Sequence, residues 1–447
     1  MKTKTLISLL VCALLGLAQQ QSDMVVKLIG QDKPTIAVPD LRGSGGAQAL
    51  MSTFNGTLYA DLETSGVFKM APKTMYPTQV PQRPQDFQKP ADNSAPTGLW
   101  LTGWANPPVN ANYLTFGYAA ESSGQFVLYG WLYNVKQPDL VNAQMIGKTY
   151  LGPLNDGGAR KVAHEFAADI LKLFGVEGLF GTKIFFISAR SGTKELWSMD
   201  YDGQNEKQVT FYKTITTMPS VAPDGARVAF TSYLDGLPKI VVHSAETNRR
   251  LPFFNQEASM NSNLSFAPDG KHVVYSSSVS GHPNLYIADS NGGGIKRLTS
   301  GRFIDVEAKV NPKTGTDVLF ISGRGGPQQL YRMSIEGTDV ERLSTGEGQV
   351  SNPSWHPNGT HVAFSWTKGF EPGNFNIFIM DIADKKYVQL THGAGRNENP
   401  SWAPDGRHIA FASNRSGSMQ IYSMLADGSQ VRQLTKGGRN EMPVWSK

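Results

Sequence analysis

Short runs of alternating hydrophobic and polar residues repeat through the C-terminal part of the chain. Each follows a turn of the Pro-Asp-Gly type, and examples are residues 228–232, 273–277, 362–365 and 409–413. Period-two alternation rich in β-branched and aromatic residues is typical of strands, and Asp-Gly supplies the positive φ of a tight hairpin. A third apolar run and a fourth, ending in Gln-Leu-Thr or a variant of it, follow in each unit. The pattern predicts repeated four-stranded antiparallel sheets.

The repeats have the length expected of propeller blades. Their turn prolines are Pro223, Pro268, Pro312, Pro357 and Pro404, spaced 44 to 47 residues apart. Strand-rich repeats of about 40–45 residues indicate a β-propeller, and six fourth-strand endings predict six blades. Residues 183–190 match a second strand, and the missing first strand is expected to be 443–446. We therefore predict a propeller over residues 179–447, closed by 443–446.

A different pattern occupies residues 22–178. Apolar residues at helical spacing predict helices over 47–62 and 163–174, and strands are expected at 35–41, 113–119, 126–133 and 144–150. The predicted fold class is an α/β N-terminal domain followed by an all-β six-bladed propeller. His164, beside Arg160 and Lys161, is expected to be solvated or to cap its helix.

Residues 1–18 have the pattern of a signal peptide. Lys2 and Lys4 precede an apolar stretch over 6–17 that is too short to span a bilayer, and Gly16 and Ala18 suit a cleavage site. Cys12 is the only cysteine and lies inside this stretch. The formal charge of +5 becomes +3 without the two leader lysines, which is too weak to indicate nucleic-acid binding.

Motifs of common enzyme and metal sites are missing from the sequence. It contains no Gly-x-Ser-x-Gly elbow and no His-Glu-x-x-His pair. Trp355, Trp402 and Trp445 share one repeat position, where packing between blades is favoured over an aromatic ligand cage. We predict no catalytic residue, no metal and no cofactor.

Variable segments precede each predicted first strand. They are residues 214–218, 260–263, 302–307, 349–352, 396–399 and 439–442, and we expect them to be loops gathered at one mouth of the central channel. They differ between blades while the strands repeat. Their polar, Arg- and Met-containing sequences fit a protein-binding surface and ordinary surface loops about equally well.

Beyond these patterns, the chain resembles the TolB family of the Tol-Pal system. The resemblance is most specific over residues 160–170 and 175–184, and it includes the leader, the α/β domain and six repeats of the type Pro-Ser-Trp-Ala-Pro-Asp-Gly. It implies a non-enzymatic, monomeric periplasmic adaptor that supports outer-membrane integrity and cell division. Such proteins bind Pal, a peptidoglycan-associated outer-membrane lipoprotein, at the propeller mouth, and contact the inner-membrane protein TolA through the mature N-terminal segment.

The resemblance implies two sets of contact residues. Met260, Asn263 and Val306 fall where the family's Pal contacts lie. The full set of candidate Pal-like contacts is Met260, Asn261, Asn263, Arg302, Asp305, Val306, Glu307, Asn352, Arg396, Asn397, Arg439 and Asn440. The candidate TolA-like contacts are Ser22, Asp23, Met24, Val25, Val26, Lys27 and Leu28, whose apolar alternation suits addition to a partner sheet.

The alternative is a small-ligand or glycan binder, or an enzyme, that uses the channel as a pocket. Such a site would need converging carboxylates at the mouth. The acids available there are Asp305, Glu307, Glu398 and Glu441, and three arginines stand among them.

Overall fold

A computed structural model describes residues 33–91, 97–368 and 374–447. The chain divides into two compact units, with the boundary between Phe180 and Gly181. None of the helices in these described ranges is long and apolar enough to span a bilayer.

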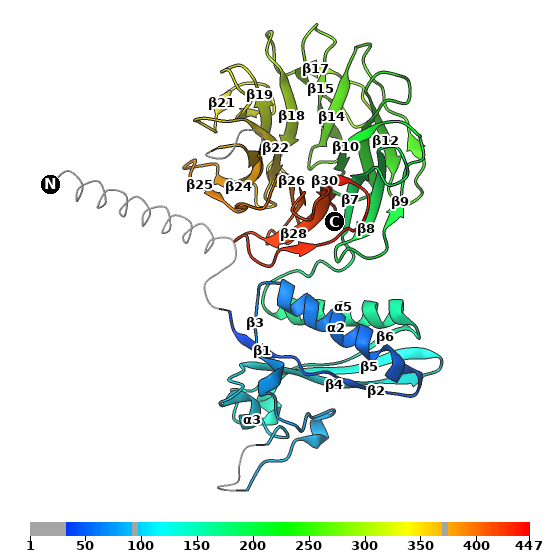
Figure 1. The fold of residues 1–447 in the computed structure, drawn as a ribbon, viewed down its shortest axis with the longest axis vertical. Coiled ribbons are helices and arrows are strands. Elements are labelled where there is room, and N and C mark those ends of the chain that lie inside the picture. The colour runs from blue at the N-terminus through cyan, green and yellow to red at the C-terminus, as the bar shows by residue number, and fades with distance from the viewer. Residues whose placement is uncertain (1–32, 92–96, 369–373) are drawn as a thin grey trace, which may run out of the picture. The chain divides into compact units, whose positions relative to one another are not determined.

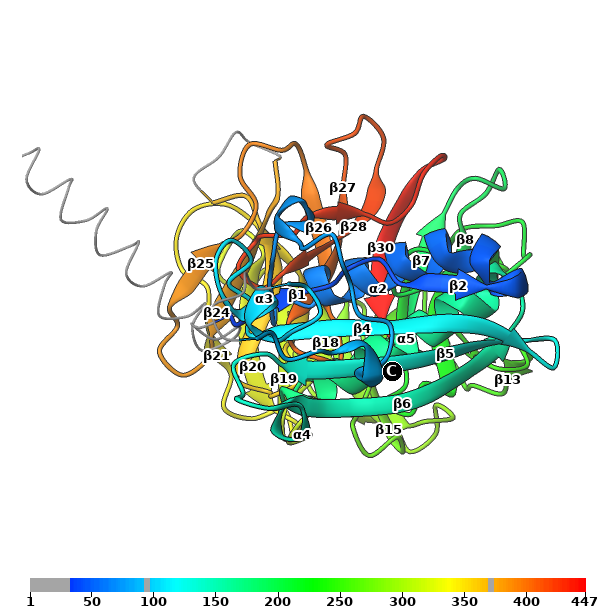
Figure 2. The same cartoon turned by 90° about the horizontal axis from the view of Figure 1, so that it is seen from below.

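The first unit is a six-stranded mixed sheet covered by helices. Its strands are β1 Thr35–Ala37, β2 Arg42–Ser44, β3 Lys69–Met70, β4 Tyr113–Ser122, β5 Gln125–Asn134 and β6 Gln144–Pro153. Their order is β3-β1-β4-β5-β6, with β2 beside β4. The short strands β1, β2 and β3 pair in parallel, and the long strands β4 to β6 form an antiparallel meander that Figure 2 shows side by side.

Two helices lie on one face of this sheet (Figure 1): α2 Met51–Thr64, preceded by η1 Gly45–Leu50, and α5 Asp156–Leu173. Phe54 and Leu58 of α2 and Phe166 of α5 are fully buried against Phe126 of the sheet. The helical spacing of apolar residues in the sequence therefore identifies the faces that pack.

The opposite face of the sheet is covered by the proline-rich segment between β3 and β4. Its short helices are η2 Lys73–Met75, η3 Pro84–Asp86 and α3 Thr102–Ala105, and α4 Leu140–Ala143 follows β5. Trp104 and Phe87 pack there with Phe116 and Tyr133 in a second core. Both faces of the sheet are therefore buried.

His164 of α5 is buried, so the expected solvated or capping role is wrong. Its Nδ1 lies 2.6 Å from a carboxylate oxygen of Asp61 on α2, and both side chains are nearly inaccessible. α2 and α5 pack against each other at this contact, so His164 lies between the two helices.

Helix α5 ends where its sequence indicates, because Gly175 adopts the positive φ of 72° that a helix C-terminus favours.

The second unit is a six-bladed propeller, which confirms the predicted fold class. Blade 1 contains β10 Thr216–Val221, β11 Arg227–Ser232, β12 Lys239–Ser244 and β13 Arg250–Leu251. Blade 2 contains β14 Asn261–Phe266, β15 His272–Ser277, β16 Asn284–Asp289 and β17 Lys296–Arg297. Blade 3 contains β18 Asp305–Val310, β19 Asp317–Ser322, β20 Gln329–Ser334 and β21 Glu341–Arg342.

The remaining blades follow the same plan. Blade 4 contains β22 Val350–Trp355, β23 His361–Trp366, β24 Asn376–Asp381 and β25 Tyr387–Gln389. Blade 5 contains β26 Asn397–Trp402, β27 His408–Ser413, β28 Gln420–Leu425 and β29 Arg432–Gln433. Blade 6 combines β30 Asn440–Trp445 with β7 Lys183–Ser188, β8 Glu195–Asp200 and β9 Lys207–Gln208.

Blade 6 joins the two ends of the propeller. Val444 pairs with Phe185 and Trp445 with Ile184, in antiparallel register. This pairing leaves no blade without its innermost strand, which removes edges that would otherwise be open to aggregation. Buried side chains also fill the spaces between blades; one such cluster includes Phe185 and Ile187 of blade 6 with Val228 and Phe230 of blade 1.

Candidate partner-binding site

All six first strands begin at one face of the propeller. In blade 2, Asn261 at the start of the first strand pairs with Ser277 at the end of the second, and Ser277 pairs with Asn284 at the start of the third. Every blade repeats this register, and Figure 1 labels the six first strands around the centre of the ring. We call this face, with the turns between second and third strands, the mouth.

The segments expected to be loops are largely the beginnings of the first strands, so that expectation is wrong. Each first strand contains a β-bulge, as between Ser262 and Ser265, where the pairing with the second strand shifts. The third strand residue has a φ of 53–56° in every blade; these residues are Met218, Asn263, Glu307, Asn352, Asn399 and Met442. The extra residue of a bulge is left unpaired in the strand ladder. Its side chain can therefore vary as a loop residue does.

The six bulge residues line the central channel. The channel holds a cavity of about 280 Å³, walled by the third to sixth residues of the first strands. Trp355, Trp402 and Trp445 contribute to this wall but are 5–7% exposed, which confirms packing between blades as their main role. Among the described residues that line the cavity, Glu307 and Lys309 carry the formal charges.

Glu307 and Lys309 are half-buried in the channel wall. Burial raises the pKa of Glu307, although a hydrogen bond from the backbone N–H of Asn352 and the charge of Lys309 oppose this rise. Burial likewise lowers the pKa of Lys309 from its ordinary value. The pair forms a charged patch in a wall otherwise made of amide, hydroxyl, thioether, aromatic, aliphatic and proline side chains.

Most of the four acids predicted at the mouth are paired with cations. Glu398 lies 2.6 Å from Arg396, and Asp305 accepts two 3.0 Å hydrogen bonds from Arg324. Burial alone would raise the pKa of Glu441, but hydrogen bonds from Lys194 and Arg439 hold it below its ordinary value. Glycoside hydrolysis uses two carboxylates facing one bond. Three of the four acids instead form ion pairs with Lys or Arg side chains. In the described ranges, no cluster of His, Cys, Asp and Glu could hold a metal.

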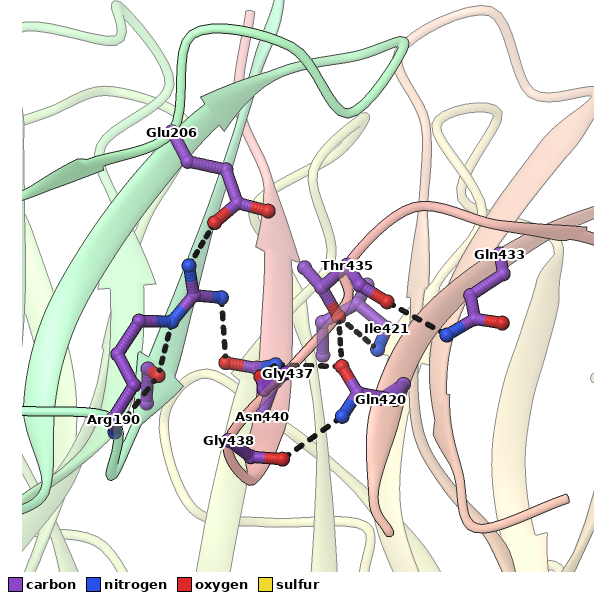
Figure 3. A network of polar contacts seen from close by, with 10 residues as sticks. Arg190, Glu206, Gln420, Ile421, Gln433, Thr435, Gly437, Gly438 and Asn440 are labelled. Atoms are coloured by element: carbon purple, nitrogen blue, oxygen red, sulfur yellow. Dashed lines mark hydrogen bonds and ion pairs between the residues drawn. The ribbon is translucent and has the colours of Figure 1, made fainter. Parts of the chain in front are cut away.

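Four of the predicted partner contacts are buried inside the blades. Asn261, Asp305, Asn397 and Asn440 have no exposed surface. Arg415 donates to Asn397 at 2.9 Å, and Arg190 donates to Asn440 at 3.1 Å (Figure 3). Asp305 accepts from Arg324, and the amide nitrogen of Asn261 donates to the carbonyl of Gln256 at 2.8 Å. We therefore remove these four residues from the candidate contact surface.

The other eight candidates remain accessible at the mouth. Met260, Asn263, Val306, Glu307 and Asn352 are half-buried, whereas Arg302, Arg396 and Arg439 are exposed. The side chains of Arg396 and Arg439 are 47% and 60% exposed. These eight residues come from all blades but blade 1, so the site is distributed around the ring.

Sequence reasoning missed several residues of the same surface. Met218, Asn399 and Met442 complete the ring of bulge residues, and Lys194 reaches the mouth from the β7–β8 turn to pair with Glu441. The first three lie in the variable segments found in the sequence but were left out of the candidate contacts, and aligning the six first strands by their Pro-Ser-Trp positions would have included them. The candidate segment 22–28 and the predicted signal peptide lie outside the described residues.

Comparison with known families agrees with this architecture. The family model described as "TolB beta propeller domain" matches residues 170–369 and 345–447. A "Protein TolB homolog" of Chlorobium luteolum is 33% identical over 315 residues, covering 68% of this chain and 68% of its own length. The chain belongs to the TolB family.

Further members of the family match over different lengths. The "Tol-Pal system protein TolB" of Bordetella pertussis is 40% identical over 183 residues, which are 40% of this chain and 41% of that protein. The crystal structure of TolB from Acinetobacter baumannii has a TM-score of 0.74 at 23% identity, covering 93% of this chain and 97% of that one. This last likeness concerns the fold, and it extends over both units.

Proposed function

We propose that the protein is a non-enzymatic periplasmic adaptor of the Tol-Pal system that binds a Pal-like outer-membrane lipoprotein at the propeller mouth. The observation that carries this proposal is the ring of variable residues set on a repeated frame. The first strands keep one backbone geometry in six blades, including the bulge, while the side chains at the bulge and directly before the strand vary among Met, Asn, Glu, Ile, Gln and Arg. Such a surface offers many distinct contacts on rigid elements, which suits recognition of a folded protein.

The site chemistry favours binding over catalysis. Three of the four acids predicted at the mouth, Asp305, Glu398 and Glu441, are paired with cations. The accessible set mixes Met, Asn and Arg, and residues of the Met and Arg types are enriched at protein interfaces. A standard interface of about 800 Å² per partner would cover several blades at once.

We further propose that residues 22–28 bind a TolA-like inner-membrane protein. The alternation in Met24, Val25, Val26, Lys27 and Leu28 supports addition of an extended segment to a partner sheet. The adaptor would then engage partners of both membranes and support outer-membrane integrity during division.

Calorimetric titration of the mature chain with the soluble domain of the organism's Pal-like lipoprotein tests the mouth proposal. Asn263→Arg and Arg396→Glu should each weaken binding, by about 30-fold if the residue is a hot spot. The matched control is Arg249→Glu in the exposed turn between β12 and β13, at the face opposite the mouth. If both mouth variants bind the lipoprotein domain as tightly as the control variant does, the contact lies elsewhere.

Deletion of residues 22–28 tests the second contact. The shortened chain should lose binding to the TolA-like protein and keep its Pal-like partner. Loss of both partners, or of neither, would contradict separate sites.

A further inference from the structure

The residue directly before each first strand divides the mouth into two halves. In blades 1 to 3 this residue is Ile215, Met260 or Ile304, and in blades 4 to 6 it is Gln349, Arg396 or Arg439. Ile215 and Ile304 are both 48% exposed. The six positions are equivalent in the backbone, so the difference between the halves is one of side-chain chemistry alone.

Neighbouring turns extend the apolar half. The backbone N–H of Asn261 donates to the carbonyl of Pro238, and that of Asp305 to the carbonyl of Pro283. The turn between second and third strands of one blade therefore lies beside the start of the next blade. The exposed apolar residues on these adjoining segments are Leu234, Leu237, Val279 and Phe303, each 41–48% exposed. Together with Ile215, Met260 and Ile304 we call them the apolar sector.

The other half places cations above carboxylates. The side chain of Arg439 is 60% exposed, and that of Lys194 is 38% exposed, while Glu441 between them is 9% exposed. The side chain of Arg396 is 47% exposed and forms an ion pair with Glu398, whose side chain is 15% exposed. The positive groups are therefore nearer to a partner than the negative ones. We call Lys194, Arg396 and Arg439 the cationic sector.

The division into two halves gives a bound partner one preferred orientation, which six similar blades alone would not. Six blades of one backbone geometry present six similar orientations to a protein placed over the channel. An apolar contact and a charge contact on opposite halves make one rotation more favourable than the other five, because misplaced carboxylates would be desolvated against apolar side chains.

We propose that the mouth is a two-part recognition surface for the partner proposed above, which presents an apolar loop to blades 1 to 3 and carboxylates to blades 5 and 6. This inference rests on the proposed function and adds the chemistry and the orientation of the partner. Exposed apolar side chains gathered on adjoining segments mark interaction sites, and complementary charges beside them set partner and register. The partner's contact face is therefore acidic on one side and apolar on the other.

The two sectors respond differently to salt. Exposed charge contacts weaken as ionic strength rises from about 50 to about 300 mM, whereas apolar contacts change little. Titration of the mature chain with the soluble domain of the Pal-like lipoprotein at both salt concentrations separates them. Arg396→Glu and Arg439→Glu should weaken binding roughly tenfold or more at low salt and remove most of its salt dependence. Leu237→Ser and Ile304→Ser should weaken binding by a similar factor at both salt concentrations.

Matched controls lie on the opposite face. Val340→Ser, at a residue 42% exposed between β20 and β21, controls the apolar variants, and Arg249→Glu controls the charge reversals. Melting curves of every variant, with Ile304→Val and Arg396→Lys as milder substitutions, separate lost contacts from lost folding.

Three outcomes would overturn the inference. If neither sector's variants disturb binding but Asn263→Arg still weakens it, the two-part surface is removed and the proposed function stands. Apolar variants that lose binding to anionic lipid vesicles, and not to the protein domain, would assign that sector to a membrane instead. Failure of the wild-type chain to bind the domain at all removes the proposed function and the inference together.

Discussion

The guanidinium of Arg190 donates to the side-chain oxygen of Asn440 at 3.1 Å, although 250 positions separate them. The amide nitrogen of the same asparagine donates to Gln420 of blade 5 at 2.7 Å (Figure 3). Arg190 also lies over the ring of Trp197 and donates to Ser188. Asn440 therefore ties the last strand both to the β7–β8 turn and to the preceding blade.

This contact should be measurable as a coupling free energy. In a double-mutant cycle, Arg190→Ala and Asn440→Ala should show a coupling of about 0.5–3 kcal/mol, because each single variant already breaks the shared hydrogen bond. The matched cycle is Arg415→Ala with Asn397→Ala, which removes the equivalent contact within blade 5. Denaturant unfolding measures both cycles. Additive effects at Arg190 and Asn440 would show that this bond does not help to hold the ring closed.

Removal of residues 443–447 should open the propeller. The deletion takes away the pairs Val444–Phe185 and Trp445–Ile184 and the buried indole of Trp445. Loss of a core tryptophan alone costs about 3–5 kcal/mol, so the truncated chain should unfold at a clearly lower temperature. Deletion of the exposed Lys447 alone is the control. A truncated protein that melts with the control would contradict closure by this strand.

The sequence predicts the strands and turns of the blades better than it predicts which side chains are accessible at the mouth. Alternating strands and Pro-Asp-Gly turns predict six blades because sheet pairing and tight turns are local in their demands. The bulge is not visible in this way: at Met218, Glu307 and Met442 a positive φ occurs without glycine. Nor does the sequence reveal that Asp305 is bound to Arg324, because that contact depends on the turn meeting the strand start in space. Polar residues that look free in the sequence are therefore partly structural.

Bulge residues other than asparagine carry backbone strain. A side chain at φ near +55° costs about 1–2 kcal/mol for most residues, and asparagine tolerates it best. Met218→Asn should therefore raise the free energy of unfolding by up to about 1 kcal/mol, and the reverse change Asn263→Met should lower it similarly. Thermal or denaturant unfolding of the two variants tests this. Stabilisation by Asn263→Met would show that side-chain contacts in the channel outweigh the backbone preference.

His356 holds blades 4 and 5 together in its neutral form. Its Nε2–H donates to the carbonyl of Gly406 at 2.8 Å, and its Nδ1 accepts from the N–H of Asn358 at 3.0 Å. A proton on Nδ1 would point at the N–H of Asn358, so protonation would break this hydrogen bond. Burial lowers the pKa of His356 below its ordinary 6.5, and the charge of His361 adds to this, although the hydrogen bond to Gly406 opposes it.

The lowered pKa of His356 makes the propeller less stable in acid. As the pH falls below about 6.5, the unfolded chain takes up a proton at this histidine that the folded chain does not, so the free energy of unfolding decreases by at most about 1.4 kcal/mol per pH unit. Above about pH 7.5 this contribution vanishes. His356→Asn should flatten the dependence between pH 5 and 7, because asparagine does not titrate in this range. Asparagine can also make the equivalent bond between blades, since Asn311 of blade 3 donates to the carbonyl of Gly359 in blade 4. Unfolding curves of wild type, His356→Asn and the exposed-site control His392→Asn over this range test the prediction, and parallel pH profiles for wild type and His356→Asn would contradict it.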